Sequence, residues 1–375
     1  MDYGFSVTDL TGAAVSTDEL TALRFDQSEY TSFEEFVHRI DDLPSKPTRV
    51  SVRRLGVNGK VVNDRMDKYL GHMGESSSLL KEVLKSPRHY LVARNGEVKP
   101  RNTAHFDLGT FVHSAFLEPQ KFDKVLIEPP ANRGTIEGLR TLIRYYWELL
   151  GRAQDADLSS MKMQDMRAKL AELETEAADA GYSFVDAQTS TIINVLRAAY
   201  RTYGGGIIPR LLRCARSETS MYTTDPQTGL AVKIRPDAML LEEQVGVNVI
   251  VSVKTTSAPS PKAFMCDAAR YRYELSEGMY LEVASHVMGR KFSGTLMIMA
   301  QTTLPYQVAL IWLDAEDLQI GKYKYRQALD ILYQCKINKS WPGFDCMAEE
   351  GAHGILQIRF PEWIKYELEP QNITQ

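Results

Sequence analysis

The sequence has few cysteines, no long apolar run and no excess of positive charge. Only four of its 375 residues are cysteines, and no two of them form a C-x-x-C pair. This spacing is unlike a disulfide framework and favours free thiols in a reducing compartment. No stretch approaches 18 uninterrupted apolar residues, and the opening MDYGFSVTDL lacks the basic and apolar regions of a signal peptide. We therefore expect a cytoplasmic protein without a membrane span.

The charge of the chain is nearly balanced. Forty-four Lys and Arg residues against 48 Asp and Glu residues give a formal net charge of −4. The whole molecule therefore carries no field that would attract nucleic acid, so any such contact must use local basic patches. A hydrophobic content of 44% and a charged content of 25% are those of an ordinary globular protein, which excludes a fibrous or largely disordered chain.

The first half of the chain has mainly helical signals. Residues 1–70 are polar, with a strand-like run at 48–55, and carry no recognisable chemistry, so we expect an N-terminal extension. Serine caps and apolar repeats then predict a helix over LLKEVLKSPRHYLV that Pro87 ends or kinks. A second predicted helix, 107–117, places Gly109 and His113 on one face. Further helices are predicted within 137–180, as a helical insertion, and at 189–203.

The pattern changes after residue 218. Strands are predicted at 218–222, 230–241, 247–256, 295–302 and 307–313, with helices at 263–287 and 314–335. In the third strand Val249, Val251 and Val253 face one way, whereas Ile250, Ser252 and Lys254 face the other. The fold class is therefore α/β: a mixed sheet flanked by helices.

Two acids and a lysine fall on neighbouring predicted strands. Asp237 follows Pro236 in the second strand, Lys254 lies in the third, and Glu218 begins the hairpin. Carboxylate oxygens can hold a hard divalent cation, while an ammonium group supports a water nucleophile or phosphate charge. This order of an acid and then x-x-K is typical of PD-(D/E)xK nucleases. The pattern alone also fits an exposed turn acid and a solvated lysine.

Five ordered segments carry a wider resemblance, which covers roughly residues 75–345. They are SLLKEVLKSPRHYLV, LGTFVHSAFLEPQKFD, CARSETSMYTTDPQTGLAVKIRPDAML, VSVKTT, and PYQVALIWLDAEDLQIGKYKYRQAL followed by WPGF. In these segments the chain resembles the exodeoxyribonuclease VIII (RecE-like) group of PD-(D/E)xK nucleases, which is distantly similar to lambda exonuclease. The resemblance implies a restriction-endonuclease-like nuclease core over residues 71–345 and a C-terminal tail, 346–375, packed on that core.

The resemblance also implies roles for individual residues. Glu218 and Asp237 would be ligands of Mg²⁺ or Mn²⁺, Lys254 would position or deprotonate the attacking water, and His113 would contact the site from its helix. The implied activity is hydrolysis of phosphodiesters, as an exonuclease on double-stranded DNA ends in recombination or repair. The implied setting is a phage or prophage, with a homo-oligomeric ring and a single-strand annealing protein as partner.

The chain departs from the family pattern at two positions. Ser252 stands where the family has an acid two residues before the lysine, and Ser276 stands where the following helix usually has a glutamine. A neutral hydroxyl binds Mg²⁺ far less well than a carboxylate. We predict that Glu277, on the helical stripe with Ser276, supplies the missing carboxylate; Glu274, one turn earlier, is the alternative. A catalytically degenerate relative that binds DNA ends or acts as a scaffold is the rival interpretation.

Six cations flank the predicted site in the sequence and are candidate DNA contacts. We expect them to neutralise a few phosphates and make binding depend on salt. They are Arg210, Arg213 and Arg216 before Glu218, and Lys262, Arg270 and Arg272 after Lys254. The alternative is that some of them simply pair with neighbouring acids.

Overall fold

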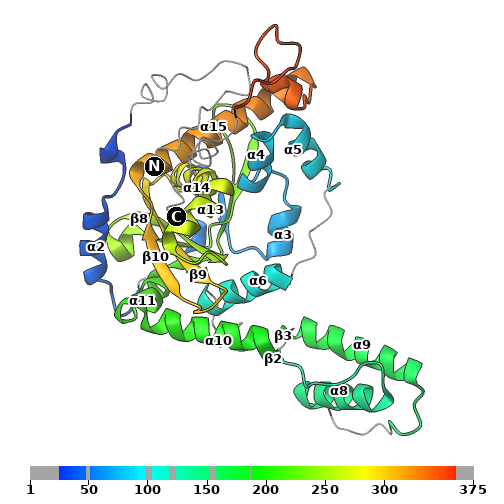
Figure 1. Cartoon of the computed structure of the whole chain (residues 1–375). Coiled ribbons are helices and arrows are strands. Elements are labelled where there is room, and N and C mark those ends of the chain that lie inside the picture. Colours follow the sequence, from blue (N-terminus) through cyan, green and yellow to red (C-terminus); the bar gives the residue numbers. More distant parts are fainter. Residues whose placement is uncertain are drawn as a thin grey trace, which may run out of the picture.

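A computed structural model of the chain describes residues 25–47, 51–97, 104–117, 124–152, 158–185 and 187–359, with backbone only at 53 and 104–107. Figure 1 shows a central sheet covered by helices on both faces, with two further helices projecting from this body. In the described part of the chain, no helix is long and apolar enough to cross a membrane.

The central sheet has five strands in the order β10-β9-β8-β7-β4. Strands β8 and β9 are parallel and the other neighbouring pairs are antiparallel. A second sheet has the order β1-β5-β6, and a third pairs β2 with β3. The strands are β1 (Lys60–Val62), β2 (Val125–Ile127), β3 (Ser183–Val185), β4 (Arg216–Ser217), β5 (Ser220–Thr224), β6 (Ala231–Ile234), β7 (Ala238–Leu240), β8 (Asn248–Thr256), β9 (Phe292–Gln301) and β10 (Val308–Trp312).

The helices account for most of the remaining described chain. They are α2 (Phe33–Asp41), α3 (Met66–Gly71), α4 (Ser77–Val83), α5 (Pro87–Arg94), α6 (Ala104–Leu117), α8 (Ile136–Leu149), α9 (Met163–Asp179), α10 (Ala187–Thr202), α11 (Ile207–Cys214), α12 (Glu242–Val245), α13 (Pro261–Arg270), α14 (Tyr273–Met288) and α15 (Ala315–Asn338). Short 3-10 helices lie at Gln27–Glu29, Val52–Arg54, Tyr203–Gly205 and Phe344–Met347.

The alternating pattern of β8 divides the core into two apolar clusters. Val249, Val251 and Val253 pack in one cluster with α6, α10 and α11, whereas Ile250 packs in the other with α4, α14 and α15. The predicted facing of this strand is therefore confirmed. All ten residues of β9 are buried, as expected for a strand with helices over both faces. Polar residues on β8 must then satisfy their hydrogen bonds inside the protein.

Proline residues divide two of the predicted elements. The predicted break at Pro87 is confirmed: Ser86 caps α5 and Pro87 occupies its first turn, so the segment forms two helices. The strand predicted at 230–241 was wrong as one element: it divides into β6 and β7, which lie in different sheets. Pro236 has no backbone N–H to donate to a neighbouring strand. The chain therefore leaves the β1-β5-β6 sheet before Pro236 and joins the central sheet at β7.

Two other predicted boundaries also shift. The helix predicted at 263–287 is interrupted between α13 and α14, where Arg272 has a left-handed φ of 52°. In the strand-like run 48–55, residues 52–54 form a 3-10 helix and 48–50 lie outside the described residues. The strand β1, which pairs antiparallel with β5, was not predicted.

The described part of the N-terminal region packs on the central body. Tyr30, Leu55 and Val61 belong to one apolar cluster of the core. Phe36 of α2 belongs to the other and stacks on Trp312 of β10, with ring centres 4.3 Å apart. The expected N-terminal extension therefore contributes to the core along much of its described length.

The predicted helical insertion at 137–180 contains two helices, α8 and α9. These helices bury an apolar cluster of their own, which includes Leu142, Ile143, Met166 and Leu173. They project from the body beyond the end of α10 (Figure 1). At the other end of the chain, residues 349–359 are largely exposed, and the rest of the predicted C-terminal tail lies outside the described residues.

Candidate active site

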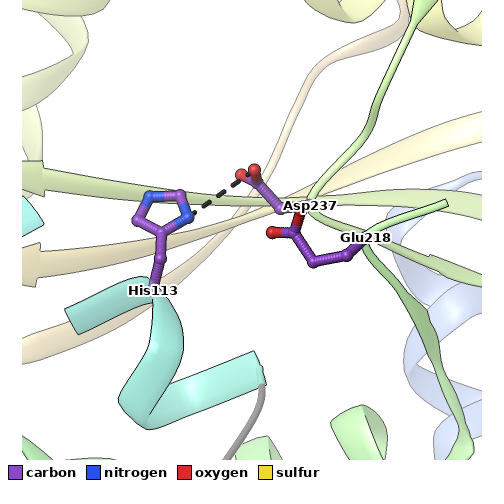
Figure 2. A group of neighbouring side chains, drawn as sticks. All are labelled: His113, Glu218 and Asp237. Atoms are coloured by element: carbon purple, nitrogen blue, oxygen red, sulfur yellow. Dashed lines mark ion pairs between the residues drawn. The ribbon is translucent and has the colours of Figure 1, made fainter. Parts of the chain in front are cut away.

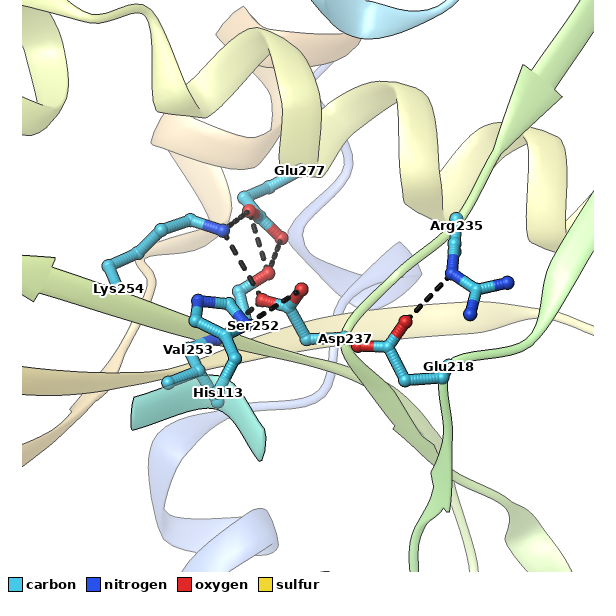
Figure 3. A network of polar contacts seen from close by, with 8 residues as sticks. All are labelled: His113, Glu218, Arg235, Asp237, Ser252, Val253, Lys254 and Glu277. Carbon is cyan, nitrogen blue, oxygen red and sulfur yellow. Dashed lines mark hydrogen bonds and ion pairs between the residues drawn. The ribbon is translucent and has the colours of Figure 1, made fainter. Parts of the chain in front are cut away.

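Asp237 lies at the centre of a polar network on the central sheet (Figure 3). It directly precedes β7, and its Oδ2 accepts a hydrogen bond of 2.7 Å from the backbone N–H of Val253 on β8. Its own carbonyl oxygen accepts from the backbone N–H of Glu218, at 2.9 Å. Asp237, which lies between β6 and β7, is therefore held through its carboxylate, and its carbonyl oxygen in turn holds the backbone of Glu218.

Three potential metal ligands converge beside this carboxylate (Figure 2). One donor atom from each of His113, Glu218 and Asp237 lies within 4.8 Å of the other two. The Nδ1 atom of His113, on α6, is 3.6 Å from Oδ1 of Asp237. The three side chains are 29%, 21% and 18% exposed, so solvent reaches the cluster. We call these three residues the open cluster.

Glu218 is held in place by an arginine that the sequence analysis did not single out. The Nε atom of Arg235 donates to Oε2 of Glu218 at 2.7 Å, while its Nη1 donates to the carbonyl of Asp64 and to Ser220 Oγ, both at 2.8 Å. Glu218 itself has a left-handed φ of 52°, which is unfavourable for a residue with a side chain. The signal was available, because Arg235 is the arginine of the R-P-D motif.

A second pair of polar side chains lies deeper in the protein. Ser252 on β8 donates its hydroxyl to the carboxylate of Glu277 on α14, with 2.8 Å to each oxygen. Both side chains are 0% exposed. The carboxylate of Glu277 therefore lies against the position where the family pattern has an acid. We call Ser252 and Glu277 the sealed pair.

Lys254 lies between the open cluster and the sealed pair. Its Nζ is 3.5 Å from Asp237 Oδ2 and 3.9 Å from Glu277 Oε1 (Figure 3). Glu274, the alternative acid, forms an ion pair with Lys324 on α15 at 2.7 Å. The structure thus brings together six predicted site residues: His113, Glu218, Asp237, Ser252, Lys254 and Glu277. Their catalytic and ligand roles stay predictions.

The pKa shifts differ in sign across this network. Burial raises the pKa of Asp237, but Lys254, His113 and the Val253 N–H outweigh it, so its pKa lies below the ordinary 3.8. Burial lowers the pKa of Lys254, but the carboxylates of Asp237 and Glu277 raise it above 10.5. Burial raises the pKa of Glu277 above 4.5, and Lys254 and Ser252 only partly offset this. Asp237 and Lys254 are therefore both charged at neutral pH.

The open cluster fits a divalent cation. It offers two carboxylates and one imidazole within ligand distance of one another, and one of the carboxylates has a lowered pKa. Carboxylate oxygens suit Mg²⁺ and Mn²⁺, and the imidazole nitrogen adds a donor that Mg²⁺ rarely takes. The donor set therefore suits Mn²⁺ at least as well as Mg²⁺.

The six predicted DNA contacts do not form one group. Arg210 and Arg213 are exposed on α11, on the side of the sheet that packs against α6, whereas Arg216 lies in β4 opposite Met239, which packs in the other apolar cluster. Lys262 and Arg270 lie on α13, which packs on the opposite face, and Arg270 pairs with Asp267 at 3.4 Å. Arg272 lies between α13 and α14. Any role of these residues in DNA binding stays a prediction.

Comparison with known proteins identifies the fold. A family model described as a PDDEXK-like domain of unknown function (DUF3799) matches residues 76–350. This match confirms the predicted PD-(D/E)xK fold class. No curated protein matches the chain.

Two solved structures are distantly similar. The crystal structure titled "Putative exonuclease" from Eubacterium rectale has 13% sequence identity and a TM-score of 0.45, and the match covers 82% of this chain and 99% of that one. A structure named SSO0001 has 12% identity and a TM-score of 0.22, with 60% of this chain and 85% of that one covered.

Proposed function

The chain belongs to the PDDEXK-like family, and from this premise we propose that it is a metal-dependent deoxyribonuclease that hydrolyses phosphodiesters at the ends of double-stranded DNA. The observation that carries the proposal is the open cluster, in which His113, Glu218 and Asp237 converge beside Lys254. Two carboxylates, an imidazole and a charged lysine in one solvent-accessible place match the chemistry of phosphodiester hydrolysis.

Each side chain has a distinct task in this proposal. Glu218, Asp237 and His113 would hold a divalent cation, which supplies Lewis-acid polarisation of the phosphate and a more acidic bound water. Arg235 and the Val253 N–H keep the two carboxylates oriented. Because the pKa of Lys254 is raised, its ammonium group stays protonated at neutral pH. Lys254 therefore donates hydrogen bonds to water or phosphate and does not act as a base.

The finer features of the proposal depend on the resemblance in sequence. They are a RecE-like exonuclease of the cytoplasm that acts in recombination or repair, a phage or prophage setting, Mg²⁺ or Mn²⁺ as cofactor, a homo-oligomeric ring, and a single-strand annealing partner. A ring would retain the enzyme on DNA by topology, so a modest basic lining would suffice.

The test is a cleavage assay on end-labelled linear duplex DNA and on closed circular DNA, with Mg²⁺ or Mn²⁺. We expect the linear substrate to be degraded from its ends and the circle to survive. Asp237→Asn should abolish the activity, whereas Asp165→Asn, the same change at an exposed residue of α9, should not. Cleavage of the circle would reject an exonuclease, and equal activity in the two variants would reject the site.

The rival function is binding of DNA ends without cleavage, and Ser252 favours it because its hydroxyl replaces an acid of the motif. This rival predicts that the protein binds linear duplex in preference to circles but cleaves neither with Mg²⁺ or Mn²⁺. Specific end binding with no cleavage in either metal would therefore replace the nuclease proposal.

A further inference from the structure

The connection between α13 and α14 alternates cations and aromatic rings: Arg270, Tyr271, Arg272 and Tyr273. Tyr271 is 58% exposed and stacks on Tyr273, with ring centres 5.9 Å apart and ring planes inclined by 27°. Arg272 has a left-handed backbone, which turns the chain between the two helices. An exposed aromatic face thus continues from a ring that borders the active site.

The 27° inclination between the rings of Tyr271 and Tyr273 leaves the two faces close to parallel. Offset, nearly parallel rings are a favourable arrangement for aromatic side chains. The outer ring, that of Tyr271, is therefore presented to solvent by a packed neighbour.

Lys81 brings a further cation to the same place from α4, which packs against α14. Its Nζ lies 5.2 Å from the centre of the Tyr273 ring, and Nζ of Lys254 lies 5.6 Å from that centre. In the described part of the chain no ion pair involves Lys81. Burial, together with the charges of Lys254 and Arg272, lowers the pKa of Lys81 to about 8. This amine is therefore poorly neutralised by its surroundings.

Arg272 has an unsatisfied donor beside this amine. Its Nη1 is buried and has no hydrogen-bond partner among the described residues. Burial lowers the pKa of Arg272, and Glu274 and Glu82 only partly offset this. Those two acids are already engaged, Glu274 by Lys324 and Glu82 by Lys85. A buried guanidinium N–H without an acceptor is costly, and a phosphate oxygen would satisfy it.

From these contacts we infer that Lys81, Arg272 and Tyr271 form a subsite for a single-stranded nucleotide next to the active site. The two cations bind backbone phosphates and the exposed ring of Tyr271 stacks on a base. Cations interleaved with aromatic rings are the usual means of holding unpaired strands. Bases inside a duplex have both faces covered by their stacked neighbours, so the inference assigns the ring to a base of an unpaired strand. This inference rests on the proposed function, since it places the strand end beside Lys254.

The test measures binding of a short duplex that carries a single-stranded overhang, with a blunt duplex for comparison. Ca²⁺ replaces Mg²⁺ so that binding is read without cleavage, and 2-aminopurine in the overhang reports stacking by loss of fluorescence. Tyr271→Ala should weaken overhang binding on the order of tenfold and abolish the quenching, whereas Tyr271→Phe should keep both. Lys81→Met should weaken binding and reduce the salt slope by about 0.7. Lys85→Met is the matched control, because Lys85 lies four residues further along the chain and is paired with Glu82. It should change neither the binding nor the salt slope.

Two results would overturn the inference. One is equal binding of the overhang by the wild-type protein and by folded Tyr271→Ala and Lys81→Met variants. The other is a loss that is as large for the blunt duplex as for the overhang. Because binding is measured without cleavage, an inactive wild-type protein that still discriminates the overhang would contradict the nuclease proposal and leave the subsite standing.

Discussion

The open cluster and the sealed pair adjoin the same lysine, yet they differ in almost every physical respect. His113, Glu218 and Asp237 are partly exposed, whereas Ser252 and Glu277 have no exposed surface. The pKa of Asp237 is lowered, against the effect of burial, whereas that of Glu277 is raised by burial. Carboxylates beside one lysine can therefore have separate tasks: some are available to a ligand, and one is held by the protein.

The sealed pair also explains how the chain accommodates a serine in the motif. The strand β8 supplies only a hydroxyl at Ser252, and the negative charge comes from Glu277 on α14. Lys254 lies within 4 Å of carboxylates from both groups. The lysine therefore keeps two acidic neighbours although its own strand provides none.

The largest effect should come from breaking the open cluster with Asp237→Asn. The amide can still accept the Val253 N–H, but it loses the charge that faces Lys254 and the metal. We expect cleavage to fall by about 1000-fold and Mn²⁺ affinity to fall with it. Calorimetric Mn²⁺ titration and the cleavage rate check this. Unchanged Mn²⁺ binding in the folded variant would show that these three residues are not the metal site.

The next largest effect concerns the sealed pair. From the family pattern alone, Ser252→Asp restores the motif acid and is expected to raise metal affinity or activity. The structure changes this expectation, because the new carboxylate would lie against the fully buried Glu277. We predict that Ser252→Asp alone lowers the free energy of unfolding by about 3 kcal/mol, as an uncompensated buried charge does.

A second substitution provides the control. Ser252→Asp combined with Glu277→Gln keeps one carboxylate in the pair and moves it to the strand, so it should recover most of the lost stability. Urea denaturation of the two variants measures this. If the double variant is as unstable as the single one, repulsion between the carboxylates is not the cause.

Glu277→Gln alone should lower the cleavage rate by about 10- to 100-fold, the usual cost of losing a group that orients an active-site residue. The amide cannot balance the charge of Lys254, whose Nζ lies 3.9 Å away. Glu274→Gln is the matched control, since it lies on the same helix but pairs with Lys324. Equal rates in the two variants would mean that Glu277 has no part in catalysis.

The sequence predicted which residues form the candidate site better than it predicted the contacts between the elements that carry them. Periodicity in β8 predicted which side chains share a face, and the R-P-D and V-K-T-T segments located Asp237 and Lys254. The match of Gly109 and His113 to one helix face likewise brought His113 to the cluster. These predictions depended on local spacing, which an element fixes by itself.

The sequence predicted Glu277 as the missing carboxylate but kept Glu274 as the alternative, because contacts between elements depend on how those elements pack. The pairing of Ser252 with Glu277 requires α14 to lie over β8 at one particular height, and Lys81 reaches Tyr273 only because α4 packs on α14. Close contact between Gly278 and Gly321 sets the approach of α14 to α15, since a Cβ at Gly278 would lie 2.3 Å from the backbone of Gly321. No spacing within one element encodes such a distance.

A smaller effect should appear in the dependence of stability on pH. The pKa of Glu277 is raised in the folded protein, so folding favours its protonated form. Its contribution to stability is full below pH 4.5 and is lost as the pH rises through the folded pKa. The Glu277→Gln variant has no carboxyl group at this position, so it does not lose stability in this way. The difference in melting temperature between the variant and the wild type should therefore move in favour of the variant as the pH rises, and a constant difference would contradict the raised pKa.

The smallest effect should come from Gly109→Ala, which tests how tightly α6 must approach β8 to deliver His113. A Cβ at this position would lie 3.2 Å from Thr255 Oγ1, so one of the two elements must give by a few tenths of an ångström. Alanine also favours a helix over glycine by about 1 kcal/mol, which offsets the crowding in the free energy of unfolding. We therefore expect nearly unchanged stability with a cleavage rate a few fold lower, because His113 lies one turn further along the same face. Thr255→Ala in the same chain removes the crowding oxygen and should restore the rate, and Gly71→Ala, which adds a methyl group to open space, should have no effect on it. A rate that stays low in the double variant would mean that the loss arises from something other than the spacing of α6 and β8.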